Sequence, residues 1–86
     1  MPEISRFFGI EIKMYWADHQ PPHFHAVYGA DVALVDIRAL RAFAGHLPAR
    51  ALGLVIEWAA LHQKELLANW DQAQKQEPIG KIEPLR

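Results

Sequence analysis

Three of the five histidines in this sequence lie within one octapeptide, "DHQPPHFH", which runs from Asp18 to His25. Imidazole binds transition metals and exchanges protons near neutral pH, because its unperturbed pKa is about 6.5. Two consecutive prolines separate His19 from His23 and interrupt regular structure, since proline lacks an N–H and has a fixed φ. The octapeptide is therefore either a chemical site or a turn that is rich in histidine.

A predicted β-hairpin decides which groups share a face with these histidines. Strands over residues 23–28 and 31–38 are joined by Gly29 and Ala30, a two-residue loop of the kind that closes hairpins. Residues that pair across a hairpin lie on the same face of the sheet. The outer face is then expected to carry His23, His25, Leu34 and Asp36, and the core face Phe24, Ala26, Ala33 and Val35.

Three interpretations of this outer face remain open. The first is a site for a divalent transition metal such as Zn, Mn, Ni or Fe, since imidazole and carboxylate groups bind these ions. Its candidate ligands are His19, His23 and His25 together with Asp36 or Asp18.

The second interpretation is a hydrolase, with the same groups acting either on a metal or as an acid and a base alone. Cleavage of an RNA phosphodiester is one example, in which Lys13 or Arg38 neutralises phosphate charge. The candidate catalytic residues are His23, His25 and Asp36. The third interpretation is a turn without chemistry, whose histidines form hydrogen bonds or lie in solvent.

The elements that position these residues follow from hydrophobic periodicity. Apolar residues alternate with other residues from Phe8 to Trp16, which predicts a first strand with one buried face. The segment that ends at Gly45 is either a short fourth strand or an irregular loop. Residues 48–75 are rich in Ala, Leu, Gln and Glu and predict one long helix that begins near a proline.

The expected architecture is a single α+β domain over residues 1–86. A three- or four-stranded antiparallel β-meander, over about residues 7–45, packs against one long C-terminal α-helix over about residues 48–75, and residues 76–86 form a tail. A chain of this length buries only about 60–65% of its potential surface, so its core is small.

The predicted helix has a wider apolar stripe than a helix that covers one sheet requires. Leu54, Trp58 and Leu61 widen the stripe on one flank and are candidate contacts for a second copy or another protein. The alternative is that the tail folds back over the helix through its apolar residues Ile79, Ile82 and Leu85.

Composition narrows the classes of function. The net charge is −1, which gives no bulk attraction to nucleic acid, so binding to nucleic acid would need a local basic patch. The sequence contains no cysteine, which excludes disulfides, zinc–thiolate sites and thiol nucleophiles. It has no apolar run of about 20 residues and no signal-peptide pattern, so we expect a cytoplasmic protein that does not span a membrane.

Three blocks of the sequence resemble one family. "MPEISRFFGIEIKMYWADHQPPHFHAVYG", "GHLPARALGLVIEWAALHQKELLANW" and "KIEPLR" together are similar to the small bacterial domain of unknown function 4160 family. The resemblance covers nearly the whole chain and implies a compact α+β domain without a settled activity.

The resemblance also implies a partner. Members of the family resemble halves of two-gene units beside the domain of unknown function 2442 family, an arrangement similar to toxin–antitoxin pairs. The chain is therefore expected to be a protein-interaction component of such a unit, with the neighbouring gene product or a second copy as its partner. A structural interaction module without a site is the remaining alternative. The positions that match the family's motif are Asp18, His19, Pro21, Pro22, His23, Phe24 and His25.

Overall fold

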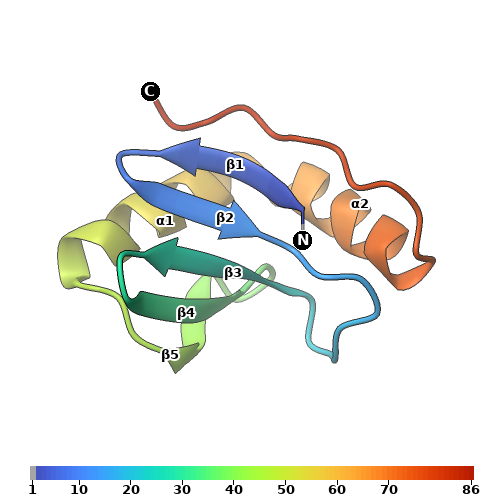
Figure 1. Ribbon diagram of the computed structural model, residues 1–86, viewed down its shortest axis with the longest axis horizontal. Helices are drawn as coiled ribbons and strands as arrows, with labels where there is room; N and C mark the ends of the chain where they lie inside the picture. Colours follow the sequence, from blue (N-terminus) through green and yellow to red (C-terminus); the bar gives the residue numbers. More distant parts are fainter. Residues whose placement is uncertain (1) are drawn as a thin grey trace.

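The computed structural model describes residues 2–86 and contains a five-stranded antiparallel meander with two helices (Figure 1). The strand order across the sheet is the order along the chain, β1-β2-β3-β4-β5. The expected α+β class is confirmed, whereas the strand and helix counts differ from the prediction. The elements are β1 (Glu3–Phe7), β2 (Ile10–Lys13), β3 (His23–Tyr28), β4 (Asp31–Asp36), β5 (Arg41–Gly45), α1 (Ala49–Leu61) and α2 (Gln63–Gln74).

The central hairpin has the register that its loop predicts. In β3 and β4, His23 pairs with Asp36 and His25 pairs with Leu34. Gly29 occupies the first loop position with a φ of 61°, a conformation that is easily adopted only without a Cβ. The predicted core face is also confirmed, because Phe24, Ala26, Ala33 and Val35 have no exposed surface.

The single first strand predicted over Phe8–Trp16 is wrong. The chain instead forms a tight hairpin, in which β1 and β2 are joined by Phe8 and Gly9 with φ values of 49° and 79°. Positive φ at both loop residues matches the twist of antiparallel strands. Gly9 inside the alternating pattern was the signal for this turn, since an isolated glycine in a strand pattern marks an irregularity.

The segment that ends at Gly45 is a strand, β5, at the edge of the sheet. A turn over residues 37–40 connects it to β4 and is held by Asp36. The Oδ1 atom of Asp36 accepts hydrogen bonds from the backbone N–H groups of Arg38 and Ala39, each at 2.8 Å. Asp36 therefore has a local structural task at the end of β4.

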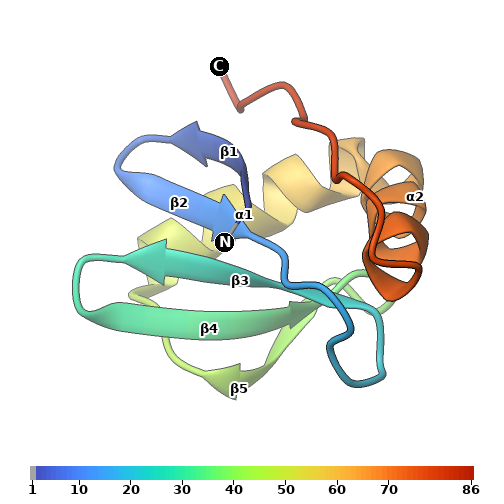
Figure 2. The same ribbon diagram turned by 45° about the vertical axis from the view of Figure 1, so that its right-hand side comes forward.

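The helix predicted as one element over residues 48–75 is two helices. The break lies at His62, whose φ of −127° is outside the helical range. Beyond the break, Gln63 donates a hydrogen bond of 2.9 Å to the carbonyl of Ile37 in the β4–β5 turn. The change of direction allows α1 to lie across the sheet and α2 to stand at the end where β3 begins (Figure 2).

Helix α1 covers the core face of the sheet. Trp58 is fully buried, with its ring centroid 5.4 Å from that of Phe7 and 5.7 Å from that of Phe24. Its indole N–H donates to the carbonyl of Glu83 at 2.8 Å. A buried indole requires such a partner, and the tail supplies it.

The tail runs back along the edge of β1 (Figures 1 and 2). The backbone N–H of Ile82 donates a hydrogen bond of 2.8 Å to the carbonyl of Ile4, and the side-chain amide of Asn69 in α2 donates one of 2.9 Å to the carbonyl of Gly80. Ile82 is 5% exposed, and Ile79 and Leu85 pack partly buried against the core. The wide apolar stripe of the helical region is thus covered in part by the chain's own tail.

Neither helix within residues 2–86 has the length and apolar character needed to cross a membrane.

Candidate metal centre

The structure brings Asp18, His23 and His25 together at the end of the sheet next to α2. One ligand atom from each residue lies within 4.8 Å of the others. His23 and His25 come from β3, and Asp18 comes from the loop that joins β2 to β3. Two imidazoles and one carboxylate are donors that suit a divalent transition metal.

The loop that carries Asp18 is fixed to α2 rather than to the sheet. Ala17 donates a backbone hydrogen bond of 3.1 Å to the carbonyl of Ala73, and the Gln74 side chain donates one of 3.1 Å to the carbonyl of Asp18. The indole of Trp16 also donates to the carbonyl of Glu77 at 2.9 Å. These contacts hold the carboxylate of Asp18 over the start of β3.

His23 is held in one orientation by its surroundings. Its side chain is only 4% exposed and packs against the rings of Trp70 and Phe43, with centroid distances of 5.3 and 5.4 Å. Its Nδ1 lies 2.7 Å from the carbonyl oxygen of Pro21. Since a carbonyl only accepts, Nδ1 carries the proton and donates it. A metal-binding histidine uses this same second contact to fix its tautomer.

The other nitrogen of His23 faces the carboxylate of Asp18. Nε2 lies 3.1 Å from Oδ2, but the contact lacks hydrogen-bond geometry, and Nε2 is buried without a hydrogen-bond partner. When the ring is neutral, Nε2 has a lone pair, so two electron-rich atoms oppose each other, and the nitrogen is buried while the Asp18 side chain is partly exposed. A cation between them would satisfy both.

His25 lies beside His23 on the outer face, with 5.4 Å between the ring centroids. Its Nδ1 is also buried without a hydrogen-bond partner, and its ring meets that of Tyr15 edge-on at 4.4 Å. Burial, together with the neighbouring His23, lowers the pKa of His25 below its ordinary value, although Asp18 opposes this. The ring is therefore neutral at pH 7, which is the form that binds metals.

The other predicted ligands are not part of this group. Asp36 pairs with His23 in the β-ladder, but its carboxylate accepts the two backbone N–H groups of the β4–β5 turn. His19 is exposed, and its backbone N–H donates to Oδ1 of Asp18 at 2.8 Å. Asp18, the alternative carboxylate in the sequence, takes the place assigned to Asp36.

The three predicted partner contacts are placed very differently. Trp58 is fully buried in the core, so its side chain is not accessible to a partner protein. Leu61 is 68% exposed at the end of α1. Leu54 lines an open cavity of about 640 Å³ with Phe8, Tyr28 and Arg50, at the opposite end of the hairpins from the histidines.

The donor atoms are close to the spacing that an ion requires. A tetrahedral zinc ion with bonds of about 2.0–2.1 Å holds its donors roughly 3.3 Å apart. The donors here lie within 4.8 Å of one another, so a contraction of at most about 1.5 Å brings them to this spacing. Asp18 lies on a loop and His25 at the half-exposed surface, where such movement is easiest.

These observations define a small α+β domain with a histidine and carboxylate cluster at one end of an antiparallel sheet. The chain belongs to the family described as Domain of unknown function (DUF4160), whose profile matches residues 9–71. The matched segment contains Asp18, His23 and His25 together with Trp70 of α2, which packs against His23. Comparisons with curated proteins and with solved structures each found no match.

Proposed function

We propose that this protein binds a divalent transition-metal ion through Asp18, His23 and His25. The observation that carries the proposal is the buried Nε2 of His23, which lies 3.1 Å from a carboxylate oxygen with its tautomer set by the carbonyl of Pro21. An unpartnered buried polar atom is unfavourable by about 1–3 kcal/mol, and a bound cation removes this penalty.

The proposed ion would keep at least one position open. Three protein ligands with a free fourth position are typical of catalytic zinc, and two histidines with one carboxylate also form the facial site of non-haem iron. Such an ion makes a bound water acidic enough to attack a substrate, so a metal-dependent hydrolase is the activity that this site would support.

Cobalt binding tests the proposal directly, because Co²⁺ in a protein site has a visible spectrum. Untagged protein is titrated with Co²⁺ and then with Zn²⁺ as a competitor. We expect one equivalent to bind to the wild type, and binding to be lost in His25→Ala. The matched control is His19→Ala, a histidine of the same octapeptide that lies outside the group. Equal binding by both variants, or negligible binding by the wild type, would contradict the proposal.

We also propose that the chain acts with a protein partner, as a component of a two-gene, toxin–antitoxin-like unit. The supporting observation is the exposed apolar surface at the turn end of the hairpins, where Phe8 is 61% exposed and Tyr28 is 40% exposed beside Leu54. Co-purification with the neighbouring gene product should be lost in Phe8→Ser and retained in Leu61→Ser. Unchanged co-purification of the Phe8 variant would exclude this surface.

A further inference from the structure

The proposed ion would be reached from one side only. Trp70 and Phe43 pack around His23, so the ion is shielded from that side. His25 lies on the outer face of the sheet, because its neighbours Phe24 and Ala26 face the core. Within residues 2–86 neither helix lies across that outer face (Figures 1 and 2). The open coordination position therefore faces the outer surface of β2 and β3.

The charge of the loaded site favours an anion as the remaining ligand. A divalent ion with one carboxylate and two neutral imidazoles leaves a formal charge of about +1 at the site.

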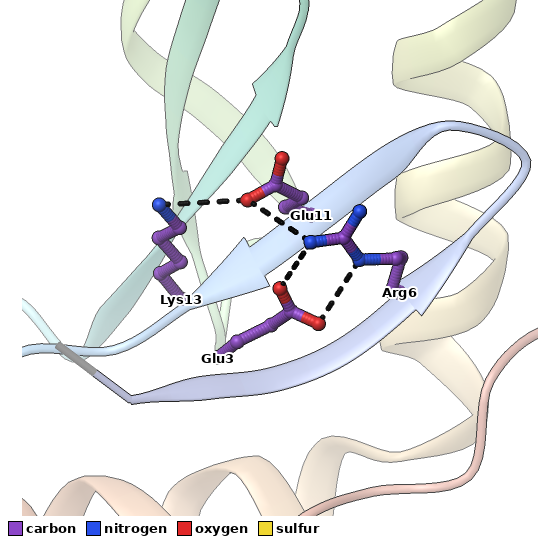
Figure 3. Close-up of polar contacts among 4 residues, drawn as sticks. All are labelled: Glu3, Arg6, Glu11 and Lys13. Atoms are coloured by element: carbon purple, nitrogen blue, oxygen red, sulfur yellow. Dashed lines mark hydrogen bonds and ion pairs between the residues drawn. The ribbon is translucent and has the colours of Figure 1, made fainter.

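A second positive charge lies on the strand next to His25. Lys13 pairs with His25 in the β2–β3 ladder, so both side chains project from the outer face on neighbouring strands. Within residues 2–86, the carboxylate at ion-pair distance from its Nζ is that of Glu11, at 3.5 Å, which is a loose contact (Figure 3).

Glu11 keeps one cationic contact when Lys13 moves away, although it shares that cation with Glu3. Its Oε1 atom also lies 3.6 Å from Arg6, which in turn forms a bidentate pair with Glu3 at 3.1 and 2.8 Å (Figure 3). Surface ion pairs stabilise by only about 0–1 kcal/mol, and the contact between Lys13 and Glu11 is long and partly exposed. Lys13 can therefore move from Glu11 to an anion on the metal at little energetic expense.

We infer that the ion takes a phosphate group in its open position, with the ammonium group of Lys13 as the second contact. This inference rests on the proposed metal site. Phosphate carries about −1.5 to −2 charges at pH 7 and has several acceptor oxygens, so one oxygen binds the ion while another accepts from Lys13. A carboxylate carries only one negative charge, so it would interact more weakly with the ion and Lys13 together.

The test uses the Co²⁺-loaded protein and has a separate readout for each step. Inorganic phosphate is added first, and adenosine monophosphate and acetate form the second and third arms. We expect phosphate to change the cobalt spectrum in a saturable way and Lys13→Gln to weaken this binding about tenfold, as for loss of one charged hydrogen bond. Lys64→Gln, which removes an exposed lysine of α2, should leave it unchanged. If adenosine monophosphate binds more tightly than inorganic phosphate, the ligand of the site is a phosphate ester. If it binds more weakly, the ligand is free phosphate.

Three results would overturn the inference. The first is a cobalt spectrum that does not change when phosphate is added. The second is equal phosphate affinity in Lys13→Gln and the wild type, and the third is acetate that binds as tightly as phosphate. Each leaves the metal site standing, because Co²⁺ binding is measured before any anion is added. Failure of Co²⁺ to bind the wild type would instead remove the metal site and this inference with it.

Discussion

Replacement of Asp18 by Asn should make the metal-free protein more stable and abolish its affinity for metal. In the wild type, Oδ2 of Asp18 opposes the unpartnered Nε2 of His23 at 3.1 Å. In Asp18→Asn, an amide N–H can replace Oδ2 and donate to Nε2. The remaining oxygen keeps the 2.8 Å hydrogen bond from the backbone of His19. A misaligned contact between two acceptors then becomes a hydrogen bond between neutral groups.

The expected size of this effect follows from the burial of His23. One net hydrogen bond between neutral groups contributes about 1 kcal/mol, and leaving its acceptor unsatisfied is unfavourable by about 1–3 kcal/mol. We expect a gain of about 1 kcal/mol, which raises Tm by roughly 4–8 °C in a domain of this size. Thermal unfolding in the presence of a chelator measures it.

The same variant should behave in the opposite way when metal is present. Free Zn²⁺ at about 100 times its Kd would stabilise the wild type by about 2.7 kcal/mol. Asp18→Asn lacks the one anionic ligand of the three and should lose more than about 100-fold in affinity, since even the loss of a residue that only hydrogen-bonds to a ligand lowers affinity about 10–100-fold. The order of the two melting temperatures should therefore reverse between chelator and metal.

A fall in the stability of the metal-free variant would refute this reasoning. If the pair were an imidazolium and a carboxylate, the substitution would break a partly buried salt bridge and leave the charge of His23 unpaired. Such changes destabilise by about 3–5 kcal/mol. The sign of the change in metal-free stability therefore distinguishes a site arranged for a cation from an ordinary ion pair.

Three further outcomes test the fold and the site. Phe8→Asn should raise the free energy of unfolding by about 0.5–1 kcal/mol, because Phe8 has a φ of 49° that Asn adopts more readily; an unchanged urea midpoint would contradict the strain. Ile82→Ala should lower that free energy by about 2–5 kcal/mol, and a change below about 0.5 kcal/mol would show that the tail does not pack as described. The stability of the metal-free wild type should fall as the pH drops below about 6.5, since unfolded His25 takes up a proton there and folded His25 only at lower pH. His25→Gln should show a flatter pH dependence, and an equally steep one would exclude His25 as its source.

The central hairpin was predictable because its determinants are local. A two-residue loop that begins with Gly29 leaves one register, and that register decides the face of every residue in β3 and β4. The same reasoning placed His23 and His25 on one strand and the apolar partners of β3 and β4 in the core. No long-range information was needed for these predictions.

The errors in the fold have two different causes. The Phe8–Gly9 turn was missed because the alternation of apolar residues continues through it, and a positive φ at phenylalanine has no propensity signal. The break at His62 has neither Gly nor Pro to mark it. It is favoured instead by tertiary contacts, such as the hydrogen bond from Gln63 to the β4–β5 turn.

The choice between Asp36 and Asp18 shows why the sequence pattern predicted the two histidines of the site but not its carboxylate. The register of the β-ladder brings Asp36 opposite His23. A carboxylate at the end of a strand is also close to the backbone N–H groups of the next turn, and the carboxylate of Asp36 accepts hydrogen bonds from two of them. Asp18 reaches the histidines only because Gln74 and the carbonyl of Ala73 hold its loop, which requires α2 to stand at that end of the sheet. The bend at His62 that puts α2 there is thus a condition for the metal site. The position of the carboxylate depends on a helix break that the sequence did not predict, and the position of the two histidines depends on a hairpin that it predicted correctly.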